Sequence, residues 1–273
     1  MTTSEQEAAP TVLILGGYLT SPFLYRRLAS RLTQRGAAAV IVAPLWTPDW
    51  VLGTVRGLGH ILAAARRSLG RAERMSVEVS GGRPVLVVGH SGGGFIARLL
   101  TSPQPFLDLQ LDRRRSIGAI VTLGTPHQVP TGGLVAGRIG RLAATFANDV
   151  VPGAFFAPEV GYVAVGSRFI VGGGRLLSRG RFAGPLYRRL HPAPDRSPID
   201  GDGLVPLACT DLPGSRRVVL ENVIHGPLAG RAWYGSVEGV DVWWPVALEA
   251  WRDALVARGA AEPGAPNATE ATR

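Results

Sequence analysis

The stretch PVLVVGHSGGGFIARLL, Pro84–Leu100, places a serine between an apolar run and a helical pattern. The run PVLVV is continuously hydrophobic, as expected of a strand that is buried on both faces. GGFIARLL has the spacing of a helix that begins directly afterwards. On such a tight turn Ser91 is forced into a strained backbone conformation, and its neighbours must be small because side chains would clash there. The turn would expose the hydroxyl at the N-terminus of the helix, where developing negative charge is favoured.

Other glycine-rich loops do not fit this stretch. It lacks the Gly-Lys-Ser/Thr ending of a phosphate-binding loop, and Ser91 stands where a dinucleotide-binding fingerprint requires its second glycine. A Gly-x-Ser-x-Gly match is weak by itself in a chain with 36 glycines, but the strand-turn-helix context is specific. We therefore predict that Ser91 is a nucleophile and not part of a flexible turn.

Outward from this turn, short β-branched runs alternate with longer helical patterns. Such alternation predicts an α/β fold with a mostly parallel central sheet and helices on both faces. The predicted strands are Thr11–Gly16, Ala39–Ala43, Pro84–Gly89, Ile117–Leu123, Gly161–Gly166 and Arg216–Glu221. The predicted helices are Pro22–Arg35, Leu52–Leu69, Gly93–Thr101 and Val240–Arg258.

The domain organisation follows from length and composition. With 273 residues, 46% of them hydrophobic, the chain can form one large domain, which we place at residues 1–259. Two segments fit the alternation poorly and follow strands, so we expect a small cap or lid region at residues 127–158 or 167–198. Leu134, Ile139, Leu142 and Phe146 could give the first segment one apolar helical face over an acyl pocket, with the second forming a basic rim. The tail, residues 260–273, lacks apolar spacing and is predicted to be disordered.

Charge and targeting signals give weaker information about binding partners and cellular location. The net charge is +9, and all 29 basic residues are arginine. Arginines at 113–115 and 175–189 could contact anionic lipid at a membrane surface, although we favour a solvated basic face as their explanation. No nucleic-acid motif or interleaved aromatics accompany them, so we expect no nucleic-acid partner. The N-terminus lacks the features of a signal peptide, and the single cysteine excludes an internal disulfide, so a cytoplasmic protein is expected.

A serine nucleophile needs a base, and the base needs an orienting carboxylate. In this architecture the three follow in the order serine, acid, histidine. His225 comes directly after the last predicted strand, where a short loop can place an imidazole over the C-terminal edge of the sheet. The other histidines lie inside the turn, in an upstream helix or before any suitable acid; they are His60, His90, His127 and His191.

The stretch SPIDGDGLVPL offers two acids, Asp200 and Asp202. Asp202 is flanked by glycines and followed by LVP, which indicates a tight turn that leads into packed structure. Asp200 could instead cap that turn. We favour Asp202 as the acid, with Asp200 as the alternative.

With these residues in hand, the chain resembles the lipase and esterase branch of the α/β-hydrolase superfamily over about residues 11–258. The matching pieces, in family order, are VLILGGYLTSP for the oxyanion loop, VVGHSGGG for the nucleophile turn, VTLGTPH for the following strand, GDGLVP for the acid and HGP for the base. Lipases of this kind usually carry His-Gly in the oxyanion loop, whereas this chain has Gly16 and Gly17.

The resemblance implies a mechanism without a metal or an organic cofactor. Ser91 would attack an ester carbonyl, His225 would act as base and then as acid, and Asp202 would hold the imidazole tautomer. The backbone N–H groups of Tyr18 and Gly92 would form the oxyanion hole. The family pattern gives His127 a structural role in the loop under the pocket.

The sequence says less about the substrate and about the molecule that accepts the acyl group. Aromatic residues after the second strand and after the base (Trp46, Trp50, Trp233 and Tyr234) predict either an apolar pocket mouth or ordinary loop packing. A small-molecule ester is the expected substrate, and we favour a lipid-like one. An acyltransferase or a thioesterase would use the same triad, and a noncatalytic protein that binds anionic lipid is a third alternative. The oligomeric state is not predicted.

Overall fold

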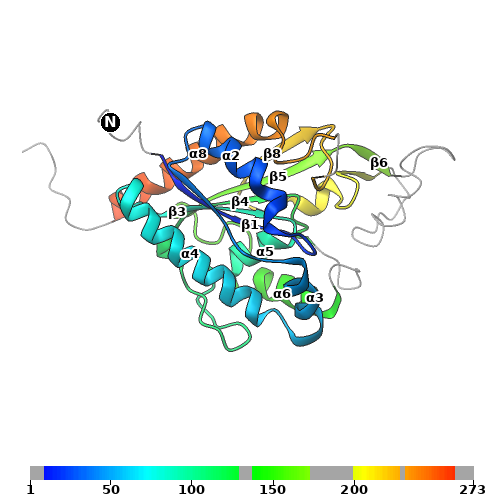
Figure 1. Cartoon of the computed structure of the whole chain (residues 1–273), viewed down its shortest axis with the longest axis horizontal. Coiled ribbons are helices and arrows are strands. Elements are labelled where there is room, and N and C mark those ends of the chain that lie inside the picture. The colour runs from blue at the N-terminus through cyan, green and yellow to red at the C-terminus, as the bar shows by residue number, and fades with distance from the viewer. Residues whose placement is uncertain (1–8, 129–136, 173–198, 228–230, 262–273) are drawn as a thin grey trace, which may run out of the picture.

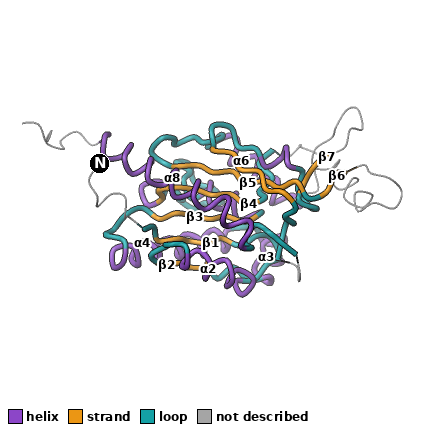
Figure 2. The backbone as a smooth tube through the Cα atoms, turned by 90° about the horizontal axis from the view of Figure 1, so that it is seen from above, coloured by secondary structure: helices purple, strands orange, loops and turns teal. Residues whose placement is uncertain are grey.

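A computed structural model describes residues 9–128, 137–172, 199–227 and 231–261 of the chain. Six parallel strands form the central sheet in the order β2-β1-β3-β4-β5-β8. Figure 2 shows β2, β1, β3, β4 and β5 side by side in this order. Their bounds are Ala39–Val42, Thr11–Leu15, Val85–His90, Ile117–Leu123, Gly161–Arg168 and Arg216–Glu221 in that order. The predicted mostly parallel sheet is therefore confirmed, and each predicted strand agrees with the structure within two residues.

Helices cover both faces of the sheet (Figure 1). One face carries α2 (Arg26–Gln34) and α8 (Val237–Ala261), and the other carries α4 (Gly59–Val79), α5 (Gly92–Leu99), α6 (Gly137–Val150) and α3 (Thr47–Arg56). The described part of the chain also contains three short 3-10 helices, η1 (Pro22–Tyr25), η2 (Arg114–Ser116) and η3 (Leu207–Thr210).

Side chains of the strands alternate between two hydrophobic cores. In β1, Val12 and Ile14 pack with α2 and α8, whereas Leu13 and Leu15 pack on the opposite face, and all four are fully buried. Successive residues of a strand point to opposite faces, so a sheet covered on both sides needs continuous apolar runs. This is why the strands were recognisable from the sequence.

The secondary structure differs from the prediction in several places. The single helix expected at Leu52–Leu69 is wrong, because the chain forms α3 and α4 there and breaks between them at Gly57, whose φ is +95°. Glycine adopts this left-handed region without a steric cost, so it ends the first helix. A two-stranded antiparallel sheet, β6 (Ile170–Gly172) with β7 (Ile199–Gly201), was not predicted, because three-residue strands leave no periodic signal.

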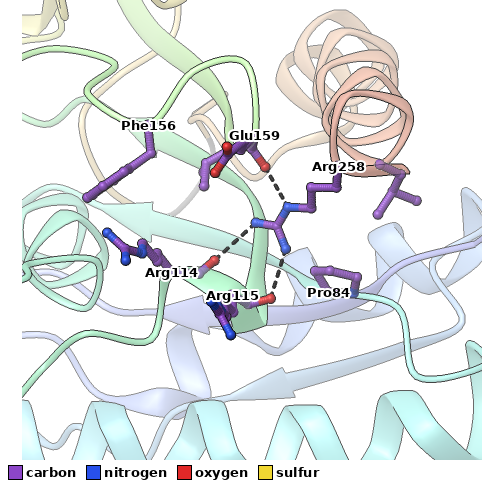
Figure 3. A pocket seen from close by; sticks show the side chains of 8 residues that line it. Pro84, Arg114, Arg115, Phe156, Glu159 and Arg258 are labelled. Carbon is purple, nitrogen blue, oxygen red and sulfur yellow. Dashed lines mark hydrogen bonds between the residues drawn. The ribbon is translucent and has the colours of Figure 1, made fainter. Parts of the chain in front are cut away.

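The N-terminal edge of the sheet holds a cavity of about 820 Å³ (Figure 3). The Arg258 guanidinium lies in it and donates hydrogen bonds to the backbone carbonyls of Glu159, Arg115 and Arg114 at 2.7, 2.8 and 3.0 Å. Arg258 also donates to the Ile117 carbonyl. These bonds tie the last turns of α8 to the entrances of β4 and β5.

Within the described residues, no helix has the length and the apolar character needed to cross a membrane.

Candidate active site

Ser91 occupies the turn between β3 and α5 with an unusual backbone conformation, φ +51° and ψ −122°. The glycines around it are required by close packing of the backbone. A Cβ on Gly89 would lie 2.6 Å from the Gly93 oxygen, and one on Gly93 would lie 2.2 Å from the Leu15 oxygen. Because only glycine fits these two positions, the helix can start directly after the strand and leave Ser91 half-buried at the edge of the sheet.

The strained conformation is held by the end of β4. The Ser91 N–H donates to the Leu123 oxygen at 2.8 Å, and the Thr125 hydroxyl donates to the Ser91 oxygen at 2.8 Å. Strain of this kind persists only where the surroundings fix it from several sides.

The structure brings Asp202 and His225 together. Asp202 follows β7 and His225 follows β8, and their side chains meet with Oδ2 and Nδ1 2.7 Å apart. The His225 N–H also donates to the Asp202 carbonyl at 2.9 Å. The alternative acid, Asp200, instead forms an ion pair with Arg168 at 2.8 Å on the surface.

The Asp202 carboxylate is fully buried but well supplied with donors. Oδ1 accepts hydrogen bonds from the N–H groups of Leu204 and Val205 at 2.9 and 2.7 Å, and the Tyr234 hydroxyl donates to Oδ2 at 2.9 Å. Burial raises the pKa of Asp202, but the neighbouring His225 and the two backbone donors outweigh it, so the pKa is lowered overall. Asp202 is therefore a carboxylate at neutral pH and can only accept, which fixes the proton on Nδ1 of His225 and leaves Nε2 as the basic nitrogen.

Among the described residues, Ser91 Oγ and His225 form no hydrogen bond with each other. His90, the residue before Ser91, places its ring 5.0 Å from that of His225, centroid to centroid, so both side chains belong to the same edge. Catalytic hydrogen bonds are often long without substrate and tighten in the complex. A proton transfer from Ser91 to His225 would thus require a side-chain adjustment.

The loop after β1 lies against the serine turn. A Cβ on Gly17 would lie 2.9 Å from the Ser91 Cβ, and one on Gly92 would lie 3.5 Å from the Tyr18 nitrogen. The N–H groups of Tyr18 and Gly92 make no hydrogen bond to another described residue. Two neighbouring free donors, one at the N-terminus of α5, can stabilise a negatively charged oxygen beside Ser91.

His127, in the loop after β4, is buried. Its Nδ1 lies 3.2 Å from an Arg98 nitrogen and its Nε2 lies 3.0 Å from the Thr122 hydroxyl. Burial, followed by the charge of Arg98, lowers the pKa of His127 well below its usual range, so the ring is neutral. Arg98 also donates to the carbonyls of Ala147 and Val151 at 3.0 and 2.8 Å, which fastens the end of α6 to α5.

The predicted apolar face of the cap region differs from the structure. Leu142 is 50% exposed, whereas Ala143, Ala144 and Ala147 are buried and form the contact surface of α6. Small side chains allow the close approach of the helix to the body, and Phe146 packs beside them with its ring 4.6 Å from that of Phe106. Leu134, the Ile139 side chain and His191 lie outside the described residues, as does most of the second cap segment, residues 173–198.

The aromatic residues expected at the pocket mouth divide into two groups. Trp50, Trp233 and Tyr234 are buried, and only Trp46 is half exposed. The bond from Tyr234 to Asp202 was not predicted from the sequence. A tyrosine shortly after the candidate base was the available signal, but its hydroxyl could not be assigned a partner before the fold was known.

Comparisons with known proteins identify the fold. The profile of the PGAP1-like alpha/beta domain family matches residues 73–135, a minor part of the chain that includes the serine turn. No curated protein sequence matches the chain.

Among solved structures, the mature form of the lipase BlEst2 from Bacillus licheniformis is 15% identical, with a TM-score of 0.54 over 89% of this chain and 92% of that one. Its propeptide form is also 15% identical, with a TM-score of 0.52 over 90% of this chain and 50% of that one. Est1E from Butyrivibrio proteoclasticus is 15% identical and has a TM-score of 0.46 over 93% of this chain and 90% of that one. At this level of identity the likeness concerns the fold alone, and the chain has an α/β-hydrolase fold.

Proposed function

We propose that this α/β-hydrolase-fold chain is a serine hydrolase that cleaves carboxylic esters through Ser91, His225 and Asp202. The observation that carries the proposal is the buried Asp202–His225 pair, with 2.7 Å between Oδ2 and Nδ1, at the same sheet edge as the strained Ser91 turn. The PGAP1-like match and the lipase structures support a hydrolase at the general level.

The proposed reaction begins when Ser91 Oγ attacks the ester carbonyl carbon while its proton passes to Nε2 of His225. The carbonyl oxygen becomes an oxyanion that accepts hydrogen bonds from the N–H groups of Tyr18 and Gly92. His225 then gives the proton to the leaving alkoxide, and the alcohol departs from an acyl-enzyme. Water attacks the acyl carbon with His225 again as base, and the acid and Ser91 are released.

An apolar acyl or alkyl group is the substrate portion that we favour. The Tyr18 and Trp50 rings form an edge-to-face pair with 5.9 Å between centroids, and a Cβ on Gly92 would lie 3.9 Å from Trp50. Leu19 and Trp46, on the loops after β1 and β2, are 46% and 48% exposed. The Thr47 hydroxyl donates to the Leu19 carbonyl at 3.1 Å and joins these two loops. Exposed apolar side chains beside the oxyanion hole suit a lipid-like ester.

A fluorophosphonate probe, combined with p-nitrophenyl esters of graded chain length, tests the proposal. We expect one label per chain, located on Ser91, and a kcat/KM that rises from acetate to longer acyl esters. A folded protein that neither takes the label nor hydrolyses any ester would contradict the proposal. It would favour the alternative of a noncatalytic binding protein.

A further inference from the structure

The Tyr25 hydroxyl lies between the oxyanion loop and the residue that precedes the nucleophile. Tyr25 is fully buried, and its Oη accepts the Gly17 N–H at 2.8 Å and lies 2.8 Å from Nδ1 of His90. On the other side of the ring, His90 Nε2 lies 2.7 Å from the carbonyl oxygen of His225. A single chain of hydrogen bonds thus runs from the oxyanion loop to the backbone of the candidate base.

The same hydroxyl also contacts the residue that orients the oxyanion donor. The Gly17 carbonyl accepts hydrogen bonds from the Thr20 hydroxyl at 2.6 Å and from the Thr20 N–H at 3.2 Å, and Thr20 Oγ1 lies 3.1 Å from Tyr25 Oη. A peptide unit is planar, so fixing the Gly17 carbonyl fixes the N–H of Tyr18 on the opposite side of that plane. Tyr25 therefore holds both peptides of the Gly17 turn.

Counting protons assigns a donor and an acceptor to each hydrogen bond between the Gly17 N–H and the His225 carbonyl. Burial, followed by the charge of His225, lowers the pKa of His90 to about 3, so the ring carries one proton at neutral pH. The His225 carbonyl can only accept, which requires that proton on Nε2 of His90. Nδ1 must then accept, and the donor it faces is the Tyr25 hydroxyl, whose single proton lies between two acceptors, His90 Nδ1 at 2.8 Å and Thr20 Oγ1 at 3.1 Å. Burial raises the pKa of Tyr25 to about 12, so the hydroxyl keeps its proton.

We propose that Tyr25 and His90 are positioning residues, which hold the Tyr18 N–H and the His225 imidazole in register with Ser91 through one relay of hydrogen bonds. This inference rests on the proposed ester hydrolysis. It adds that the positions of the oxyanion hole and of the base are both fixed by the buried Tyr25–His90 pair and not by two independent loops. Loss of the Tyr25–His90 pair would displace the Tyr18 N–H and the His225 imidazole, which act mainly in the transition state. It should therefore lower kcat and leave KM nearly unchanged.

The test uses Tyr25→Phe and three variants of His90 in the full chain. His90→Asn keeps an acceptor near the position of Nδ1, His90→Gln keeps a donor near the position of Nε2, and His90→Leu keeps neither. Thr11→Val is the matched control, because it removes a buried hydroxyl that bonds Ser80 at 3.0 Å at the far edge of the sheet. Urea unfolding is measured for each variant, and kcat is expressed per fluorophosphonate-labelled site so that unfolded protein does not count.

We expect Tyr25→Phe and His90→Leu to lower kcat per site about 100-fold, since a displacement of about 1 Å at a reacting group costs roughly that factor. KM should change little, and His90→Asn and His90→Gln should each recover part of the loss. Thr11→Val should retain wild-type kcat. In wild-type protein labelled with ¹⁵N-histidine, the nitrogen chemical shifts should show His90 with its proton on Nε2.

Three results would overturn the inference while the proposed function stands. They are a kcat per site within about threefold of wild type in Tyr25→Phe and His90→Leu, a loss confined to stability as in Thr11→Val, or a His90 proton on Nδ1. Wild-type protein without hydrolysis or labelling would instead remove the proposed function itself, which keeps the two failures distinct.

Discussion

At the C-terminal edge of the sheet, side chains hold backbone N–H groups as well as carbonyls, whereas at the N-terminal edge Trp251 and Arg258 donate to backbone carbonyls. Asp202 accepts from two loop N–H groups and Tyr25 accepts from Gly17. At the opposite edge, Trp251 Nε1 donates to the Pro84 carbonyl at 2.8 Å, and Arg258 donates to the carbonyls at the start of β4 and β5.

The two edges also differ in what they leave open. The N-terminal edge ties its carbonyls to α8, so its hydrogen bonds serve the attachment of that helix. The C-terminal edge keeps the N–H groups of Tyr18 and Gly92 without a described partner and holds Ser91 at φ +51°. Open donors and stored strain suit a site where charge develops, which agrees with the general place of ligands in open α/β sheets. We therefore expect substitutions at the C-terminal edge to change activity and those at the N-terminal edge to change stability.

The largest expected effect is that of Ser91→Ala. Ester hydrolysis should fall by a factor on the order of 10⁴ or more, because the members of a triad act as a unit. Alanine fits the same tight turn, so the urea unfolding midpoint should stay near that of wild type. Turnover that survives in folded Ser91→Ala protein would exclude the serine mechanism.

Asp202→Asn compared with Asp200→Asn separates the two acids. The amide at 202 cannot stabilise an imidazolium or hold the same tautomer, a change worth roughly 10⁴-fold in kcat in a related triad. Asp200 pairs with Arg168 on the surface, so Asp200→Asn should leave kcat within about threefold of wild type. Steady-state kinetics on one p-nitrophenyl ester decide the matter, and a greater loss in Asp200→Asn would show that the acid is misassigned.

Much of this arrangement could be predicted from the sequence because two kinds of signal are local. Strands buried on both faces must be continuous apolar runs, as in β1 and β3, and this gave the parallel sheet. The requirement for glycine at position 89 is equally local, since a Cβ there would clash with Gly93 and Gly94 of the same turn. The order of the chain then led to the two later residues of the candidate triad, Asp202 and His225.

What the sequence did not reveal depends on contacts between distant segments. The Tyr25 hydroxyl meets a ring 65 residues away, and the Tyr234 hydroxyl meets a carboxylate 32 residues away, with no periodicity to announce either bond. The helix break at Gly57 was missed because apolar spacing continues across it. On α6, helical spacing grouped Leu142 with the apolar residues, but alanines form the contact because they allow closer packing.

A smaller effect is expected for Arg258→Met at the N-terminal edge. The substitution keeps the aliphatic stem and removes the donors to the carbonyls of β4 and β5, so the free energy of unfolding should fall by about 1–2 kcal/mol. Urea unfolding measures this loss, and kcat should remain at the wild-type value. A fall in kcat without a fall in stability would break the division of roles between the two edges.

The smallest expected effect concerns the cap region. Leu142 on α6 is 50% exposed, so Leu142→Asp should cost little stability, unlike a charge placed at the buried alanines beside it. If α6 contributes a wall for an apolar chain, a charge at this position should lower kcat/KM for long-chain esters a few-fold, on the order of one kcal/mol of lost apolar contact, and leave kcat/KM for acetate esters unchanged.

Val256→Asp, at a 61% exposed position near the end of α8, is the matched control and should leave kcat/KM for both esters unchanged. An equal loss on both esters would indicate damage to the fold or the triad. An unchanged preference for chain length would place Leu142 away from the acyl group and leave α6 as a helix that only supports α5.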